Sequence, residues 1–226
     1  MIFKCFKYCV GIGVFVAFLF GVFNIPPRYL PWTPLNLNDP VNFSTSFKLK
    51  ELKEDSGACA LALATGGIEY DRLPDKTVSS CTLTNRINLK QSLYPYSAAV
   101  RPNCALAAAL VLWEREVVQK AAALHLESDI ARINHYGIFS CRNISGSSRI
   151  SQHASASAID ISGFTLKNGR SISVHNAWGD DSDEGRFLNE VHAQSCSIFN
   201  GVLGPNYNAA HADHFHLDLG PYRICR

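Results

Sequence analysis

The chain has 226 residues, of which 47% are hydrophobic and 18% are charged, and its formal net charge is +2. This composition is that of an ordinary globular protein, and without a basic tract it gives no indication of a nucleic-acid partner. Neither an internal repeat nor a low-complexity run is present in the sequence.

An apolar run near the N-terminus predicts a membrane anchor over residues 1–25. Lys4 and Lys7 precede the run, which continues for 18 residues from Tyr8 to Ile25 and is just long enough to span a bilayer as a helix. No small-x-small cleavage site stands before Pro26, so an uncleaved anchor is favoured over a signal peptide. Because both lysines lie on its N-terminal side, the positive-inside rule predicts a single-pass protein whose remaining residues are exported.

Residues 26–45 contain five prolines, a density that favours an extended spacer over a packed element. The folded domain is therefore expected to cover residues 46–226. About 180 residues are enough for one domain with its own core.

Helices and strands are expected to alternate through this domain. Residues 49–63 indicate a helix or a pair of turns, closed by Thr65-Gly66-Gly67. The clearest helix covers residues 104–126, where apolar residues recur with a period of 3.6 and Glu114 lies outside the apolar stripe. Strands are expected at residues 130–142, 158–166 and 212–219, a hairpin turn at Asn168-Gly169 leading into residues 171–174, and a last helix over residues 184–199.

Six cysteines fall in the exported part of the chain, whereas Cys5 and Cys9 belong to the apolar run. The six contain no CxxC pair, so a zinc ribbon is disfavoured and three disulfides in an oxidising compartment are predicted. Proximity in sequence and the presumed topology favour the following pairs: Cys59 with Cys81, Cys104 with Cys141, and Cys196 with Cys225.

Two short segments, Ser151–Asp160 and His211–His216, carry the residue types that bind zinc. The two-residue period of a strand turns Asp160 away from its apolar neighbours, and it places His214, His216 and Asp218 on one face of the last strand. A catalytic zinc ion takes three ligands from histidine and carboxylate side chains and keeps one open position. We therefore predict a Zn²⁺ site with the following ligands: His153, Asp160 and His216. Four other histidines lack a partner at a telling spacing and are expected to be ordinary hydrogen-bonded residues: His125, His135, His175 and His192.

The same residues resemble a known group of zinc peptidases. Ser151-x-His153 followed by Asp160, with a late His-x-His, is similar to D-Ala-D-Ala carboxypeptidases and dipeptidases, murein endopeptidases, phage endolysin peptidases and the Hedgehog signalling domain. The wider stretch closely resembles the bacterial extensin-like C-terminal domain, through the following segments: Cys104-Ala105-Leu106-Ala107, Trp113, Cys141-Arg142, residues 153–164, Val202-Leu203-Gly204-Pro205 and residues 211–218. The resemblance implies an α+β domain stapled by disulfides, in which helices flank an antiparallel sheet that carries the zinc site.

Two residues are candidates for the general base. In the resembled peptidases a residue three positions before the last ligand often takes this role, which points to Asp213. On a regular strand, however, Asp213 faces away from the metal whereas His214 faces it, so Asp213 can serve only if a bulge or turn precedes the strand. The pattern His211-x-x-His214-x-His216 also matches the histidines of the murein endopeptidases, which makes His211 a supporting residue.

The resemblance also suggests substrate-binding residues. Arg142 stands where these peptidases commonly carry an arginine for the tetrahedral oxyanion, and Arg149 is the competing arginine. Ser151 could bind a substrate carboxylate or cap a turn. Asp218 could orient a ligand imidazole or be a solvated acid at the end of the strand.

The function expected from the resemblance is that of a zinc-dependent peptidase acting on peptidoglycan stem peptides, as a D,D- or L,D-type endopeptidase or carboxypeptidase. It would be tethered to the bacterial inner membrane with its C-terminal domain in the periplasm. The alternative is a zinc-stabilised module that binds cell wall or protein without turnover, as the Hedgehog relationship illustrates. A third interpretation is a disulfide-stapled structural domain that binds no metal.

Overall fold

The computed structural model of the chain describes residue 21 and residues 25–226. The expected anchor at residues 1–25 therefore lies almost wholly outside the described residues. Within the described part, no helix has both the length and the apolar character needed to cross a membrane.

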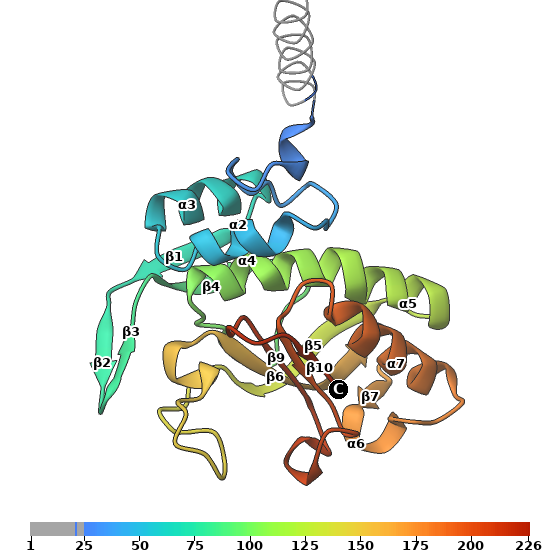
Figure 1. Cartoon of the computed structure of the whole chain (residues 1–226). Coiled ribbons are helices and arrows are strands. Elements are labelled where there is room, and N and C mark those ends of the chain that lie inside the picture. The colour runs from blue at the N-terminus through green and yellow to red at the C-terminus, as the bar shows by residue number, and fades with distance from the viewer. Residues whose placement is uncertain (1–20, 22–24) are drawn as a thin grey trace, which may run out of the picture.

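The domain is a mixed α+β structure in which helices lie on one side of an antiparallel sheet (Figure 1). Its helices are η1 (Pro27–Tyr29), α2 (Thr45–Glu51), α3 (Ser56–Thr65), α4 (Cys104–Trp113), η2 (Glu114–Val118), α5 (Gln119–His125), η3 (Gln152–Ser155), α6 (Val174–Ala177), α7 (Asp183–Ser195) and η4 (Ala209–His211). Its strands are β1 (Glu69–Leu73), β2 (Lys76–Val78), β3 (Cys81–Leu83), β4 (Arg86–Gln91), β5 (Ile130–Gly137), β6 (Ala158–Leu166), β7 (Ser171–Ser173), β8 (Gly201–Leu203), β9 (Phe215–Asp218) and β10 (Ile224–Cys225).

Strand β6 is the centre of the main sheet. The strand order is β10-β8-β9-β6-β5, with β7 paired to the far part of β6, and all these pairs are antiparallel except β10 with β8. Gly163 allows β7 to approach, because a Cβ at this position would lie 2.1 Å from the carbonyl oxygen of Ile172. The predicted strand at residues 158–166 and the hairpin at Asn168-Gly169 are both confirmed.

The expected helix at residues 104–126 is confirmed as one helical segment made of α4, η2 and α5, of which η2 is a π-helical turn. Every residue of α4 is buried, because α2 and α3 pack on the side of α4 that faces away from the sheet (Figure 1). Glu114, expected outside the apolar stripe, is instead fully buried. Its carboxylate accepts hydrogen bonds from the Tyr96 hydroxyl at 2.6 Å, the Ser92 hydroxyl at 2.9 Å and the Leu93 backbone N–H at 2.9 Å.

The proline-rich segment differs from the free spacer expected for residues 26–45. Leu35 and Leu37 are buried and belong to the same core cluster as α4. The backbone N–H of Leu37 donates to the Thr65 hydroxyl at the end of α3, at 2.9 Å. Its prolines give the segment a fixed irregular path, and its leucines pack it onto the domain.

The three disulfides are present, but only one of the expected pairs is correct. Cys196 is bonded to Cys225, as predicted from their proximity. The other two pairs are Cys59–Cys104 and Cys81–Cys141. The expected pairs were wrong because α3 packs against α4, and because the β2–β3 hairpin carries Cys81 to the loop after β5.

Several elements differ from the sequence-based expectations. The region of residues 49–63 forms two helices, and the strand expected at residues 130–142 ends at Gly137. Strand β9 begins only at Phe215 because residues 209–213 form a 3-10 helix and a turn. The β1–β4 pair, the β2–β3 hairpin and the short strands β8 and β10 carried no clear periodic signal.

Candidate metal centre

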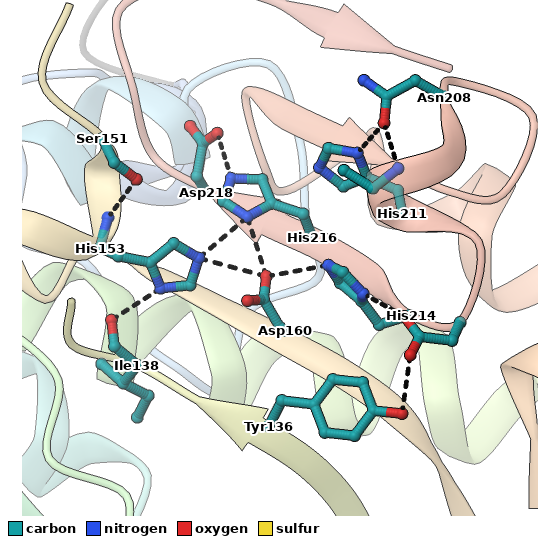
Figure 2. A network of polar contacts seen from close by, with 12 residues as sticks. Tyr136, Ile138, Ser151, His153, Asp160, Asn208, His211, His214, His216 and Asp218 are labelled. Carbon is teal, nitrogen blue, oxygen red and sulfur yellow. Dashed lines mark hydrogen bonds and ion pairs between the residues drawn. The ribbon is translucent and has the colours of Figure 1, made fainter. Parts of the chain in front are cut away.

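Three side chains from three elements meet at one point on the sheet (Figure 2). Nε2 of His153 lies 3.2 Å from Oδ1 of Asp160 and 3.1 Å from Nδ1 of His216. Nδ1 of His216 lies 2.9 Å from Oδ1 of Asp160. The sequence predicted these three residues as ligands, and the fold brings them together as a group able to hold a metal ion.

Strand register explains two of the three positions. Asp160 on β6 and His216 on β9 are direct partners in the antiparallel ladder, so their side chains project from the same face as nearest neighbours. His153 lies on η3, immediately before β6. Ala156 ends this 3-10 helix in the left-handed conformation, with φ of 53°, and returns the chain to the sheet.

Each histidine of this cluster uses its other ring nitrogen for a fixed partner. Nδ1 of His153 donates to the carbonyl oxygen of Ile138 at 2.9 Å, and Nε2 of His216 donates to Oδ2 of Asp218 at 3.0 Å. Since neutral imidazole carries one proton, the lone pairs are left on Nε2 of His153 and Nδ1 of His216, both facing Asp160. Asp218 thus contacts an imidazole of the cluster and is not merely a solvated acid at the end of the strand.

The donor set fits a zinc ion. A tetrahedral ion with ligand distances of about 2.0–2.1 Å separates its ligand atoms by about 3.3 Å. The three distances of 2.9–3.2 Å are close to this value. Two nitrogen lone pairs and a carboxylate cannot share one point without a positive charge between them, so the cluster requires a proton or a cation.

The charges around the cluster favour such a cation. Burial raises the pKa of Asp160, but the adjacent imidazoles of His153 and His216 hold it well below its usual range. Burial lowers the pKa of His216, whereas the carboxylates of Asp160 and Asp218 outweigh it and raise this pKa to about 9. The pocket around His216 therefore stabilises positive charge.

His214 lies beside the cluster and Asp213 lies behind His214. Nε2 of His214 is 3.6 Å from Oδ1 of Asp160, and its Nδ1 donates to Oδ1 of Asp213 at 2.8 Å. The other carboxylate oxygen of Asp213 accepts a hydrogen bond from the Tyr136 hydroxyl at 3.2 Å, and the Tyr136 ring stands edge-on to His214 (Figure 2). Asp213 occupies the turn before β9, yet its carboxylate is directed to His214 and Tyr136.

His211 extends the row of imidazoles. Its Nδ1 donates to Oδ1 of Asn208 at 2.7 Å, and this oxygen also accepts the backbone N–H of Ala210 at 3.0 Å. Its ring centroid lies 5.2 Å from that of His214. Burial, together with the nearby His214 and His216, lowers the pKa of His211 to about 4, so this ring is neutral at pH 7.

The cluster forms the floor of a cleft of about 300 Å³, which also includes Arg142, Arg149 and Tyr222 in its walls. Arg142 is exposed, and the guanidinium of Arg149 lies 5.6 Å from the centre of the Tyr222 ring. Both predicted arginines thus reach the cleft. Ser151 lines it as well, but its hydroxyl accepts the backbone N–H of His153 at 3.3 Å and caps η3.

Comparison with protein families gives one result. Residues 57–226 match the model of the family described as extensin-like protein C-terminus. The chain belongs to this family. Neither the curated proteins nor the solved structures include a significant match.

The extensin-like domain holds two site residues that the sequence did not single out, Tyr136 and Asn208. Tyr136 donates to Asp213, the partner of His214, and Asn208 accepts from Nδ1 of His211. Neither residue lies in a recognisable motif. The histidines expected to be ordinary lie elsewhere. His135 contacts the carbonyl oxygen of Ala98 at 3.2 Å, and His192 that of Arg226 at 3.1 Å.

Proposed function

We propose that this extensin-like domain is a zinc-dependent peptidase that acts on peptidoglycan stem peptides as a D,D- or L,D-type endopeptidase or carboxypeptidase. The observation that carries the proposal is the convergence of His153, Asp160 and His216 at the floor of an open cleft, with His214 beside them. The substrate class rests on the resemblance to murein peptidases. In the same proposal, the chain is anchored in the bacterial inner membrane and its domain lies in the periplasm.

A zinc ion bound by His153, Asp160 and His216 would supply a Lewis acid that polarises a substrate carbonyl and acidifies water. The chain's own residues must then move the proton. Nε2 of His214 carries the lone pair that faces the cluster, because Nδ1 is committed to Asp213. His214 is therefore the proposed base, and the same nitrogen can pass the proton to the leaving amine.

Asp213 and Tyr136 act through His214 in this proposal. The Asp213 carboxylate fixes the tautomer of His214 and stabilises its protonated form, while the Tyr136 hydroxyl holds the carboxylate in place. The Asp213 side chain is about half exposed, whereas His214 is mostly buried. His214 lines the cleft and Asp213 does not, which favours His214 as the group that meets the substrate.

The two arginines of the cleft match the charge of the proposed substrate. Stem peptides carry carboxylates, and the attacked carbonyl carbon becomes a tetrahedral centre with a negative oxygen. A guanidinium can donate two parallel hydrogen bonds to either group. Arg142 is assigned to the oxyanion, as the resemblance implies, and Arg149 to a substrate carboxylate. His211 remains a neutral supporting residue at the cleft wall.

The test is digestion of purified sacculi by the full-length protein, followed by chromatography of the released muropeptides. Wild type should cut the stem peptides, and the variants His216→Ala and His214→Ala should not. The exposed His175 lies outside the cluster, so His175→Ala is the matched control and should keep full activity. Sacculi left intact by wild type, while the protein holds zinc and binds them, would instead indicate the non-catalytic binding module.

A further inference from the structure

Three large aromatic side chains are exposed at the N-terminal end of the domain. Trp32 is 70% exposed, Phe43 is 69% exposed and Phe47 is 61% exposed. We refer to these three residues as the N-terminal aromatic face. Single exposed apolar residues are common on soluble proteins, but three exposed aromatic rings within sixteen residues of sequence are unusual and indicate an interaction site.

The fold turns these rings outward. On α2, Thr45, Lys48 and Leu49 are buried against the domain, and Phe47 on another side of the helix faces solvent. Phe43 stacks on Tyr29, with ring centroids 6.2 Å apart and planes within 7°. The Phe43 ring is thus packed against a second ring, and α2 fixes the side of the helix from which Phe47 projects.

Hydrogen bonds fasten the entry of the chain to this same region. The Lys48 ammonium group donates to the carbonyl oxygen of Pro27 and to the Thr33 hydroxyl, both at 3.0 Å. The Ser44 hydroxyl donates to the carbonyl oxygen of Arg28 at 2.6 Å. These bonds keep α2 and the residue before it next to residues 27–33, the segment that follows Ile25, where the apolar run that starts at Tyr8 ends.

This position favours a lipid bilayer as the partner of the aromatic face. Tryptophan and tyrosine gather at membrane interfaces, where an aromatic ring can contact both acyl chains and headgroups. Arg28 and Lys50 are exposed in the same segments and suit anionic headgroups. A face meant for a second protein would not need to lie directly beside a predicted membrane span.

We propose that the N-terminal aromatic face lies in the headgroup layer of the membrane that holds the apolar run. The proposal rests on the predicted span and does not depend on metal binding or peptidase activity. This contact fixes the orientation of the domain relative to the bilayer, in addition to the tether that the apolar run provides. The cleft loops, residues 141–151 and 204–212, lie at the end of the molecule opposite η1 and α2 (Figure 1). A docked domain therefore presents its cleft away from the bilayer.

The test is tryptophan fluorescence of the full-length chain in vesicles of phosphatidylethanolamine and phosphatidylglycerol whose acyl chains carry bromine as a quencher. Trp113 is fully buried in the core, and Trp178 follows α6 at the other end of the domain. Bromolipid quenching should therefore come from Trp32 and be lost in Trp32→Tyr. In the double variant Phe43→Ser/Phe47→Ser, the Trp32 emission should shift to the red and most of its quenching should be lost.

The matched control is Leu124→Ser on α5, since Leu124 is also 69% exposed but lies outside the face. This variant should be quenched like wild type. The proposal is overturned if Trp32 is equally open to aqueous iodide with and without lipid, or if the chain does not bind the vesicles. It is also overturned if Trp32 is shielded from iodide but not quenched by bromolipid while chemical cross-linking traps dimers, because the face would then bind a second copy.

Discussion

Oδ1 of Asp213 accepts a hydrogen bond of 2.8 Å from Nδ1 of His214, on the side of the ring away from Asp160. The same arrangement occurs at His153, His211 and His216, each of which donates one ring N–H to a fixed oxygen. In their neutral forms, the four imidazoles around the cleft thus have assigned tautomers. This pre-organisation removes the need for the rings to rotate before they bind a metal ion or accept a proton.

The contact between Asp213 and His214 predicts unequal effects of two substitutions on peptidase activity. His214→Ala should lower kcat by about 10²–10⁴-fold, because it removes the proton acceptor, and it should leave the zinc content unchanged. Asp213→Asn should have a smaller effect, since His214 keeps its position but loses the carboxylate that stabilises its charge. Steady-state kinetics with a synthetic stem peptide measures both. If Asp213→Asn abolishes kcat while His214→Ala keeps it, Asp213 is the base.

Asp218 should tune zinc affinity without binding the ion. Asp218→Asn removes the negative charge behind Nε2 of His216, and we expect zinc affinity to fall by about 10–100-fold. Competition with a chromophoric chelator measures the change. Asp213→Asn is the matched control, because it alters the partner of a histidine that is not a proposed ligand, and its zinc affinity should stay at the wild-type value.

Zinc binding should release a proton and weaken as the pH falls. Without metal, the pKa of His216 is about 9, so a proton occupies the site at neutral pH and zinc must displace it. Affinity should fall by about tenfold per pH unit below pH 9. The stability of the metal-free protein should instead decrease as the pH rises. The folded-state pKa is raised, so this stabilisation is complete below the unfolded value of about 6.5 and is lost as the pH rises through 9.

Calorimetric zinc titrations between pH 6 and pH 9, in buffers of different ionisation enthalpy, measure the released proton directly. Thermal unfolding of the metal-free protein over the same range measures the stability. A zinc affinity that does not change with pH would contradict a protonated His216.

Glu114 should make the fold less stable as the pH rises. Burial raises the pKa of Glu114 to about 7, although Tyr96, Ser92 and the Leu93 backbone N–H donate to its carboxylate. The folded state therefore holds the proton more tightly than the unfolded chain, and the free energy of unfolding should fall by about 3 kcal/mol between pH 4.5 and pH 7. Urea unfolding measures this slope. Glu114→Gln should flatten it, whereas Glu51→Gln at an exposed position should not.

The three residues of the candidate metal site were predictable from sequence because they fall in two compact motifs. The two-residue period of a strand indicated which residues of β6 share a face and which residues of β9 do. The antiparallel pairing then places Asp160 beside His216. The tautomers were not predictable, because Ile138 and Asn208 reach the histidines through loops without a periodic pattern. The relation of Asp213 to His214 depends on the turn before β9, which sequence parity could not resolve.

Long-range packing explains the other differences between sequence and structure. Cys59 pairs with Cys104 because α3 docks on α4, a contact that spans 45 residues of sequence. The burial of Glu114 was not predictable, because its partners Ser92 and Tyr96 come from an irregular segment. Leu35 joins the core although it follows Pro34 in a proline-rich segment. None of these contacts leaves a periodic signal in the sequence.

Zinc content is the most direct test of the claim that His153, Asp160 and His216 form a metal site. Full-length protein, purified without chelators and measured by mass spectrometry of metals, should hold about one zinc ion per chain. His216→Ala and Asp160→Asn should hold almost none, and His175→Ala should match wild type. A wild-type protein that holds no zinc and takes up none on titration, or a His216→Ala variant that holds as much as wild type, would contradict the account.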